Sequence, residues 1–511
     1  MEYAHRLSLS FCFLSFFIFS LFITQHHHAA ANSPKVIIVG AGMSGIMAAK
    51  TLSRSGFDDY LILEGSDRIG GRMHKKNFAG TTIEIGANWV EGLGGPHMNP
   101  IWELAKNCSL RTFFTDHSNV SANFYDSDGT HIPQSVVSAT FDLERAAANF
   151  SAALAATLRE NNEEDLSIFA AQRMFGYVPQ TPLEIAVDYL SYDAEIAEPP
   201  RITSLKNVEP ISTMSYYGED EQFVADERGY EYLVHRLAGE FMETNSGNIT
   251  DKRLHLEKVV REIQYGESGV TILVEDGSVY NADHAILSVS IGVLQSKLIR
   301  FKPELPRWKR LSIFKFDMAI FTKIFLKFPY KFWPTGPGTE AFAYASERRG
   351  YFTYWMNLEN QYPGSNMLMA VVTDDESRRI ERQADHLTKQ EAMVVLRKIF
   401  GSKIPDAEEI LIPRWGSDPL YRGTYTNWPI GVTEDDFDYL KAPVGPLYFT
   451  GEHTSKKFNG YVHGAYFSGI DTASLLLECL KYNLCLFDPK RRNLDRTFGR
   501  TRSLSSWQPY Q

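Results

Sequence analysis

Three glycines and one glutamate near the start of the chain have the spacing that a dinucleotide requires. Gly40, Gly42 and Gly45 follow the apolar run 36–39, and Glu64 ends a second apolar run. The first glycine permits a tight turn, the second lets the backbone approach a pyrophosphate, and the third allows a helix to pack closely on a strand. A carboxylate about 20 residues further on can accept hydrogen bonds from a ribose. This pattern predicts a dinucleotide at a helix N-terminus, where free N–H groups favour phosphate.

Hydrophobic periodicity predicts the elements that position these residues. Strands are expected at 36–39, 60–63, 269–274, 284–289, 320–328, 367–372 and 447–450. Helices are expected from the glycine turn to about residue 55, and at 140–160, 182–191, 230–243, 388–400 and 464–480. The alternation of strands and helices favours an α/β fold with a Rossmann-like domain.

The last predicted strand resembles the start of the chain, because it is followed by Gly451 and Glu452 and then by a segment that contains several glycines. A domain built from both parts of the chain must be discontinuous. The predicted dinucleotide-binding domain comprises 35–120, 225–310 and 431–482. The predicted substrate-binding domain, a mixed sheet with helices, comprises 121–224 and 311–430.

Both ends of the chain have the composition of processing or sorting segments. A basic residue, Arg6, precedes the apolar stretch 7–24, and three alanines follow at 29–31. This pattern predicts a signal peptide over 1–31, with a retained membrane anchor as the alternative. We expect the secretory route and extracellular delivery. The basic tail, 483–511, is expected to be disordered and leaves vacuolar sorting open.

Composition narrows the class of partner. A formal net charge of −10 argues against nucleic acid and is compatible with a cationic substrate. After removal of the leader, Cys108, Cys479 and Cys485 remain, which is too few for a disulfide scaffold and leaves at least one free thiol. No stable membrane span and no metal are expected, and a monomer is the default. Glycosylation is expected at Asn107, Asn119, Asn149 and Asn248.

Five separated segments resemble one known family. The segments 64–72 (EGSDRIGGR) and 449–454 (FTGEHT) look like signatures of the flavin amine oxidase superfamily. The segments 86–92 (GANWVEG), 321–328 (FTKIFLKF) and 459–466 (NGYVHGAY) resemble the plant secreted polyamine oxidases. The resemblance extends over nearly the whole chain that follows the leader.

The resemblance implies noncovalently bound FAD. It implies that Glu64 binds the adenosine ribose, that Arg72 serves the phosphates and flavin, and that Val260 lies near the adenine. Glu452 would approach the ribityl chain. A helix beginning near Gly460 would direct its positive end at the flavin and stabilise negative charge on the reduced cofactor.

Lys323 is the first candidate for a catalytic residue. If 320–328 is a strand, Phe321, Lys323 and Phe325 share one face. Burial between aromatic rings would lower the pKa of the Lys323 ammonium group. An isolated lysine in a strand is usually a solvated charge. The resemblance instead implies that this lysine holds a water molecule against flavin N5 and takes part in flavin reoxidation.

Two acids and several aromatic residues are candidates for the substrate site. Glu91 would form one wall of a tunnel and act in catalysis, and Glu195 is a second acid for the same task. Tyr461, a further catalytic candidate, and Tyr425 match positions that flank the substrate. Trp415 and also Tyr466 are expected to line the cavity. Buried aromatics are more often core residues than ligands, so these assignments rest on the resemblance.

The implied reaction is hydride transfer from a carbon beside a secondary amine to flavin N5. Hydrolysis of the imine and reoxidation by O2 would yield hydrogen peroxide. Spermine and spermidine would be the substrates, and 1,3-diaminopropane and an aminoaldehyde the products. Back-conversion of spermine to spermidine is the alternative. Phe321, Tyr425 and Ile196 differ from the residues usual in the family, which leaves substrate preference and pH optimum open.

Other classes are less compatible with the sequence. A monoamine oxidase would attach its flavin to a cysteine shortly before Gly451, and no cysteine occurs between Cys108 and Cys479. A histone demethylase is disfavoured by the leader, and nothing selects an arginine for an amino acid carboxylate. A nonenzymatic binding protein on the same fold is opposed by Lys323, Glu452 and Tyr461.

Overall fold

The computed structural model describes residues 34–116 and 119–482. The predicted signal peptide, the basic tail and Cys485 therefore lie outside the described residues. Of the described cysteines, Cys479 is disulfide-bonded and Cys108 is a free thiol. The odd number of cysteines predicted at least one free thiol. No helix in the described ranges is long and apolar enough to cross a bilayer.

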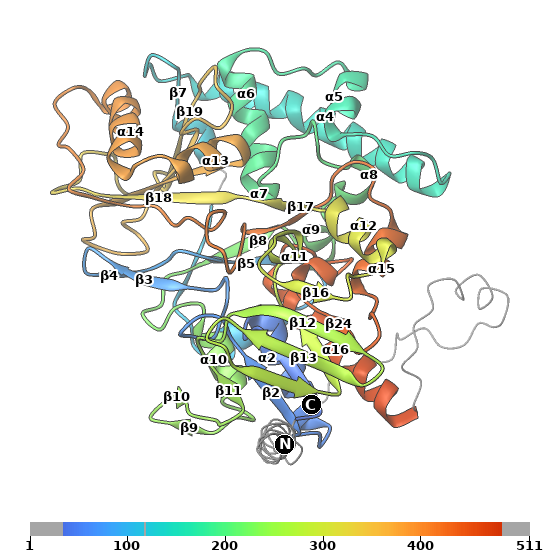
Figure 1. Ribbon diagram of the computed structural model, residues 1–511. Helices are drawn as coiled ribbons and strands as arrows, with labels where there is room; N and C mark the ends of the chain where they lie inside the picture. The colour runs from blue at the N-terminus through green and yellow to red at the C-terminus, as the bar shows by residue number, and fades with distance from the viewer. Residues whose placement is uncertain (1–33, 117–118, 483–511) are drawn as a thin grey trace, which may run out of the picture.

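A parallel sheet forms the centre of the lower half of the molecule (Figure 1). Its strands, in order, are β11 (Leu254–His255), β2 (Tyr60–Leu63), β1 (Val36–Val39), β15 (His284–Leu287) and β24 (Leu447–Phe449). All four pairings are parallel. The apolar runs that predicted these strands are buried on both faces, which is typical of parallel sheets covered on two sides.

Successive residues of β1 belong to two different cores. Val36 and Ile38 pack with two long helices, α2 (Met43–Arg54) and α16 (Val462–Tyr482). Ile37 and Val39 pack with a second sheet on the other face. That sheet has the order β14 (Val279–Ala282), β13 (Gly269–Val274), β12 (Val260–Gly266) and β16 (Arg300–Lys302).

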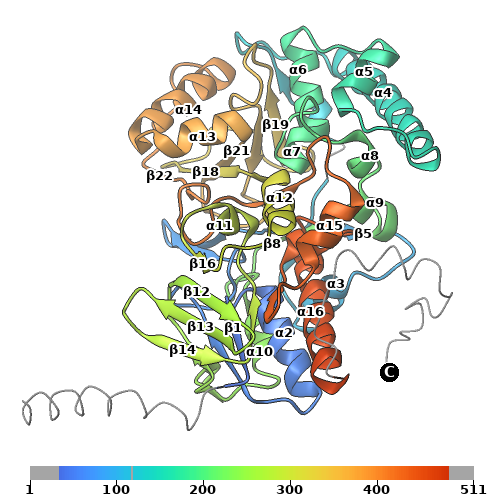
Figure 2. The ribbon, with the colours of Figure 1, turned by 45° about the vertical axis from the view of Figure 1, so that its right-hand side comes forward.

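Helices α2 and α16 lie side by side although they come from opposite ends of the chain (Figures 1 and 2). A Cβ atom at Gly469 of α16 would lie 2.3 Å from the carbonyl oxygen of Ser44, so this contact requires glycine. The discontinuous Rossmann-like architecture is thus confirmed.

A six-stranded sheet with helices around it forms the upper half (Figure 2). Its order is β22 (Glu409–Leu411), β18 (Phe321–Lys327), β21 (Met367–Thr373), β20 (Tyr354–Asn357), β19 (Ala341–Tyr344) and β7 (Phe124–Tyr125). Only the pairing of β19 with β7 is parallel, so the sheet is mixed, as predicted. The surrounding helices are α4 (Gln134–Glu160), α5 (Ile168–Phe175), α6 (Pro182–Asp188), α13 (Asp374–Arg382) and α14 (Asp385–Phe400).

The remaining elements are shorter. The strands are β3 (Lys75–Phe78), β4 (Thr81–Glu84), β5 (Trp89–Leu93), β6 (Thr112–Phe114), β8 (Asp220–Val224), β9 (Thr244–Asn245), β10 (Asn248–Ile249), β17 (Asp317–Ala319) and β23 (Tyr425–Asn427). The helices and turns are α3 (Pro100–Asn107), η1 (Val120–Ala122), the π-helix η2 (Tyr189–Asp193), α7 (Ala194–Ile196), α8 (Leu205–Val208), α9 (Ser212–Tyr217), α10 (Tyr232–Ala238), α11 (Ile291–Gln295), α12 (Arg307–Lys315), α15 (Glu434–Lys441) and η3 (Glu452–Thr454).

The helices differ most from the predictions at three places. Helix α4 begins six residues early, directly after Pro133, whose fixed φ suits a helix start. The segment 230–243 contains only α10, because the helix ends at Gly239. The segment 182–191 is α6 followed by the π-helix η2. Side-chain periodicity cannot detect a change of helix type inside one apolar stretch.

The predicted glycosylation sites differ in exposure. Asn107, Asn149 and Asn248 are exposed. Asn119 is half-buried, and its side-chain amide donates a hydrogen bond of 2.8 Å to Asp116 Oδ2. A glycan at Asn119 would have to be attached to this half-buried, hydrogen-bonded nitrogen, so this sequon is the least suited of the four.

Candidate active site

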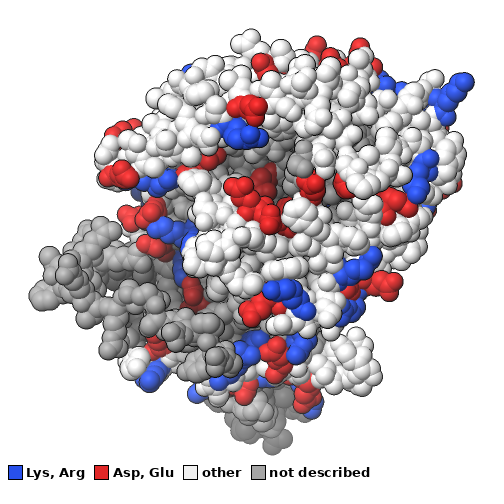
Figure 3. Space-filling model, turned by 180° about the vertical axis from the view of Figure 1, so that it is seen from behind, with Lys and Arg blue, Asp and Glu red and all other residues white. Residues whose placement is uncertain are grey.

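A cavity of about 980 Å3 is lined by residues from both halves of the molecule. One end lies beyond the carboxyl ends of β1 and β2, where open α/β sheets bind their ligands. The other end reaches β18 of the six-stranded sheet and helix α7. On the face opposite that of Figure 1, acidic side chains gather beside a hollow (Figure 3).

The glycines of the first turn differ in what a side chain would meet. Gly40 has φ +104°, and a Cβ atom there would lie 2.7 Å from the Ser288 carbonyl oxygen. At Gly45 a Cβ atom would lie 2.0 Å from the Gly40 carbonyl oxygen. At Gly42 the nearest atom, Gly71 Cα, is 3.9 Å away, and Gly42 lines the cavity. Gly40 and Gly45 are thus required for packing, whereas Gly42 keeps space open to the cavity.

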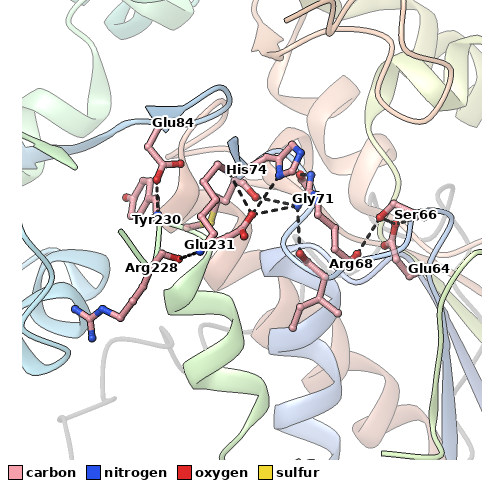
Figure 4. A network of polar contacts seen from close by, with 12 residues as sticks. Glu64, Ser66, Arg68, Gly71, His74, Glu84, Arg228, Tyr230 and Glu231 are labelled. Carbon is pink, nitrogen blue, oxygen red and sulfur yellow. Dashed lines mark hydrogen bonds and ion pairs between the residues drawn. The ribbon is translucent and has the colours of Figure 1, made fainter. Parts of the chain in front are cut away.

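Glu64 is held at the end of β2 by its own loop. Its Oε2 accepts a bond of 2.7 Å from the Ala41 N–H, and its Oε1 accepts bonds from the Ser66 N–H and hydroxyl group (Figure 4). A carboxylate has about four lone-pair sites, so one remains for a ribose hydroxyl group. Val260, expected near the adenine, is buried and also lines the cavity.

Arg68 and Glu231 brace the loop after β2, a role that sequence reasoning missed. The Arg68 guanidinium group donates to the carbonyl oxygens of Gly71 (2.6 Å) and Met73 (3.1 Å). Glu231 lies 3.6 Å from Arg68 and 3.3 Å from His74 Nδ1 (Figure 4). The only sequence signal was the place of Arg68 inside the motif 64–72.

Arg72 and Glu452 join the first and last parts of the chain. The Arg72 Nη1 group donates to Glu452 Oε1 at 2.8 Å and to the Thr424 carbonyl oxygen at 2.7 Å. Glu452 also accepts bonds from the Thr426 hydroxyl group and the Gly460 N–H. Burial alone would raise the pKa of Glu452, but the charge of Arg72 and the hydrogen bonds from Arg72 and the Gly460 N–H hold it below its usual range. Glu452 is therefore a carboxylate in the cavity wall.

Lys323 is buried on β18 and bonds to the segment that follows β4. Its Nζ donates to Asn88 Oδ1 at 2.8 Å, to the Gly86 carbonyl oxygen at 2.9 Å and to the Glu84 carbonyl oxygen at 3.2 Å. Burial lowers the pKa of the Lys323 ammonium group, although Glu84 and Glu91 oppose the shift. The predicted direction is confirmed. Lys323 also lines the cavity, 5.0 Å from the centre of the Trp89 ring.

Three carboxylates line the cavity near Lys323. Glu91 of β5 stands directly opposite Glu221 of β8, and like charges in that arrangement repel each other. Burial raises the pKa of Glu91 well above its usual range, and Glu195 and Glu221 raise it further, against the effect of Lys323. Sequence reasoning named Glu91 and Glu195 but missed Glu221, whose only signal was its place in a strand that begins with acids.

Two tyrosines position Glu195. The Tyr461 hydroxyl group donates to Glu195 Oε1 at 2.5 Å, and the Tyr425 hydroxyl group donates to the Glu195 carbonyl oxygen at 2.8 Å. Burial, with Glu195 and Glu91, raises the pKa of both tyrosines well above the usual range. Both hydroxyl groups therefore remain protonated donors.

The other aromatic candidates divide into two groups. Trp415 lines the cavity and donates from Nε1 to the Ile85 carbonyl oxygen at 2.8 Å. Tyr466 does not line the cavity, so that expectation was wrong. It packs within the core of α2 and α16, against Phe467. Ala465 of α16, one turn after Tyr461, also lines the cavity, and the next residue is rotated away.

Comparison with known proteins identifies the family. The family model described as flavin-containing amine oxidoreductase matches residues 43–477. The chain belongs to this family. It is 53% identical to polyamine oxidase 1 of Zea mays over 92% of this chain and 96% of that protein. It is 52% identical to polyamine oxidase 6 of Oryza sativa subsp. japonica over 90% of this chain and 94% of that protein.

A solved structure supports the fold. A putrescine oxidase bound to putrescine superimposes with a TM-score of 0.69, at 19% identity, over 87% of this chain and 99% of that one. At this identity the likeness concerns the fold alone.

This member of the flavin-containing amine oxidoreductases is an FAD-dependent amine oxidase. The residues at the parallel sheet fit the cofactor, since the space above Gly42 is open and the α2 N-terminus faces it. Glu64, Arg72, Val260 and Glu452 are placed along the same cavity. When bound, FAD supplies a two-electron acceptor for the hydride of an amine.

Proposed function

We propose that the chain is a polyamine oxidase that acts on spermine and spermidine at a secondary amine. Oxygen would be the final acceptor, and the products would be 1,3-diaminopropane, an aminoaldehyde and hydrogen peroxide. The polyamine oxidases named above, 52–53% identical over most of the chain, support the substrate class. The alternative is back-conversion of spermine to spermidine with 3-aminopropanal.

The observation that carries the proposal is the group of three carboxylates beside Lys323. A polyamine has several ammonium groups spaced along a flexible chain, and a bound ammonium group favours the ionised form of the acids at Glu91, Glu195 and Glu221. The acidic side chains beside the hollow on the rear face also carry negative charge (Figure 3). A bound cation would also relieve the repulsion between Glu91 and Glu221.

We expect some residues of the site to control the charge of the substrate and others to orient it. The amine that loses hydride must be neutral, and a carboxylate whose pKa is raised, as at Glu91, can accept its proton. Glu195, fixed by Tyr461 and Tyr425, would hold an ammonium group that is not oxidised. Lys323 in its neutral form would accept a hydrogen bond from a water molecule at the reacting end, since its N–H groups bond to protein oxygens. The aromatic walls exclude bulk water.

Product analysis tests the proposal. Purified, flavin-loaded protein is incubated with spermine and oxygen, and amines and peroxide are measured. We expect 1,3-diaminopropane together with peroxide. Spermidine with 3-aminopropanal would establish the back-converting alternative. If neither spermine nor, in a second incubation, spermidine yields peroxide, the proposal is contradicted altogether.

Replacement of Glu91 by glutamine should raise the KM for spermine about tenfold or more, because a bond to a charged group contributes about 1.5–3 kcal/mol. The KM for oxygen should stay unchanged, since oxygen carries no charge. Steady-state kinetics with each substrate varied in turn measure the effect. Glu267→Gln, an exposed acid at a hairpin turn, is the matched control. Equal changes in both constants would indicate a structural role for Glu91.

We further propose that the protein follows the secretory route, with glycans at the exposed asparagines and noncovalent FAD. The sequence of the leader and the exposure of Asn107, Asn149 and Asn248 support this. A fluorescent fusion lacking 483–511 distinguishes the two destinations. Unchanged extracellular delivery would dismiss vacuolar sorting by the tail.

A further inference from the structure

The hydrogen bonds of Lys323 use every donor that an ammonium group has. A protonated lysine has three N–H donors, and the acceptors are Asn88 Oδ1 and the carbonyl oxygens of Gly86 and Glu84. The Asn88 amide cannot be turned round, because its Nδ2 donates to the Val224 carbonyl oxygen at 3.0 Å. This arrangement favours the charged form of Lys323, whereas burial favours the neutral form. A compensating negative charge nearby would decide between them.

Glu84 provides a carboxyl group next to this arrangement. Its carbonyl oxygen accepts from Lys323, and its side chain is 2% exposed. Oε1 accepts a bond of 2.7 Å from the Tyr230 N–H (Figure 4). Oε2 has no hydrogen-bond partner among the described residues. An ionised carboxylate in such a place is costly unless a positive charge lies near.

The surrounding charges couple Glu84 to Lys323. Burial raises the pKa of Glu84, and the Tyr230 N–H and the charges of Lys323 and Lys75 oppose this, while Glu231 adds to it. Among the described residues, the charges that act on the pKa of Lys323 are those of Glu84 and Glu91. The two phenols nearby, Tyr230 and Tyr362, have raised pKa values through burial and stay neutral. Burial therefore brings the pKa values of the carboxyl and ammonium groups closer together, and the protonation of each group depends on the charge of the other.

We propose that Glu84 is a positioning residue for Lys323: its carbonyl oxygen fixes the Lys323 amine, and its buried carboxyl group sets how readily that amine releases a proton. Among the described residues the two side chains form no ion pair, so the carboxyl group acts through the low-dielectric interior. The inference rests on the proposed function of Lys323.

The substitution Glu84→Gln tests this with little disturbance. The amide oxygen can still accept from the Tyr230 N–H, and the amide nitrogen takes the place of the unpartnered oxygen. Loss of the negative charge makes the Lys323 ammonium group more acidic. The Lys323 limb of the pH profile for flavin reoxidation should move to lower pH by about one unit, whichever form of the amine is active. Flavin content should not change.

Glu144→Gln is the matched control. Glu144 is also a buried carboxyl group with one unpartnered oxygen, but it lies on α4 beside Ser191 and outside the cavity lining. Its substitution should leave the pH profile unchanged. A profile that does not move in Glu84→Gln, or that moves equally in both variants, would overturn the proposal.

Infrared spectroscopy gives a readout that does not depend on turnover. In the difference spectrum between wild type and Glu84→Gln, the C=O absorption of the protonated Glu84 carboxyl group should grow as the pH falls through about 7, the raised pKa of that group. In Lys323→Met the same absorption should persist to higher pH, because the counter-charge is lost. If the pH range of this absorption is the same in Lys323→Met and in the wild type, the proposal is overturned, even if Glu84→Gln fails to fold. Normal turnover in Lys323→Met would instead contradict the role of Lys323 itself.

Discussion

Lys323→Met should lower steady-state turnover about a hundredfold or more while the purified protein stays yellow. Positioned acid or base groups contribute about 10²–10⁴-fold to rate, and Lys323 is the one lysine on β18 that lines the cavity among the described residues. The residues expected to hold FAD, such as Glu64 and Glu452, make no hydrogen bond to it. Oxygen consumption with spermine and the visible flavin spectrum measure the two effects.

Lys327→Met is the matched control for this variant. Lys327 lies on the same face of β18, but its Nζ donates to the Ser365 carbonyl oxygen and it does not line the cavity. It should retain normal turnover. Thermal unfolding must be compared as well, because Lys323→Met leaves three acceptors unpaired, each at a cost of about 1–3 kcal/mol. Unchanged turnover in Lys323→Met would refute its catalytic assignment.

Replacement of glycine by alanine should affect folding at Gly45 and flavin binding at Gly42. Gly45→Ala should prevent the native fold, because its Cβ atom would lie 2.0 Å from a backbone oxygen. Overpacking of a well-packed core typically costs about 1–3 kcal/mol and occasionally more, and here the obstructing atom belongs to the backbone. Gly42→Ala should fold, since its Cβ atom meets nothing closer than 3.9 Å, yet lose most of its flavin because the methyl group enters the cavity.

Circular dichroism and the ratio of flavin to protein separate the two outcomes. Gly266→Ala serves as control, because no atom lies within 4 Å of its Cβ position and its backbone is not left-handed. It should retain both fold and flavin. Full flavin binding by Gly42→Ala would place the pyrophosphate elsewhere in the cavity.

The sequence was sufficient to predict the dinucleotide-binding end of the cavity. Gly40, Gly42, Gly45 and Glu64 act within one strand–turn–helix–strand unit, so their spacing along the chain determines their spacing in the fold. The alternation in 320–328 likewise predicted that Lys323 faces away from Ile324, because side-chain direction in a strand is a local property. Family motifs added the cofactor.

Only the tertiary structure decided which groups meet at the other end. Asn88 lies 235 residues from Lys323 along the chain and bonds to it directly, and Tyr461 lies 266 residues from Glu195. The pairing of Glu91 with Glu221 depends on the register between β5 and β8. Such pairs are set by the packing of whole elements, which no local pattern records. The protonation of Lys323 follows from that packing, because burial and the nearby carboxylates together determine its charge.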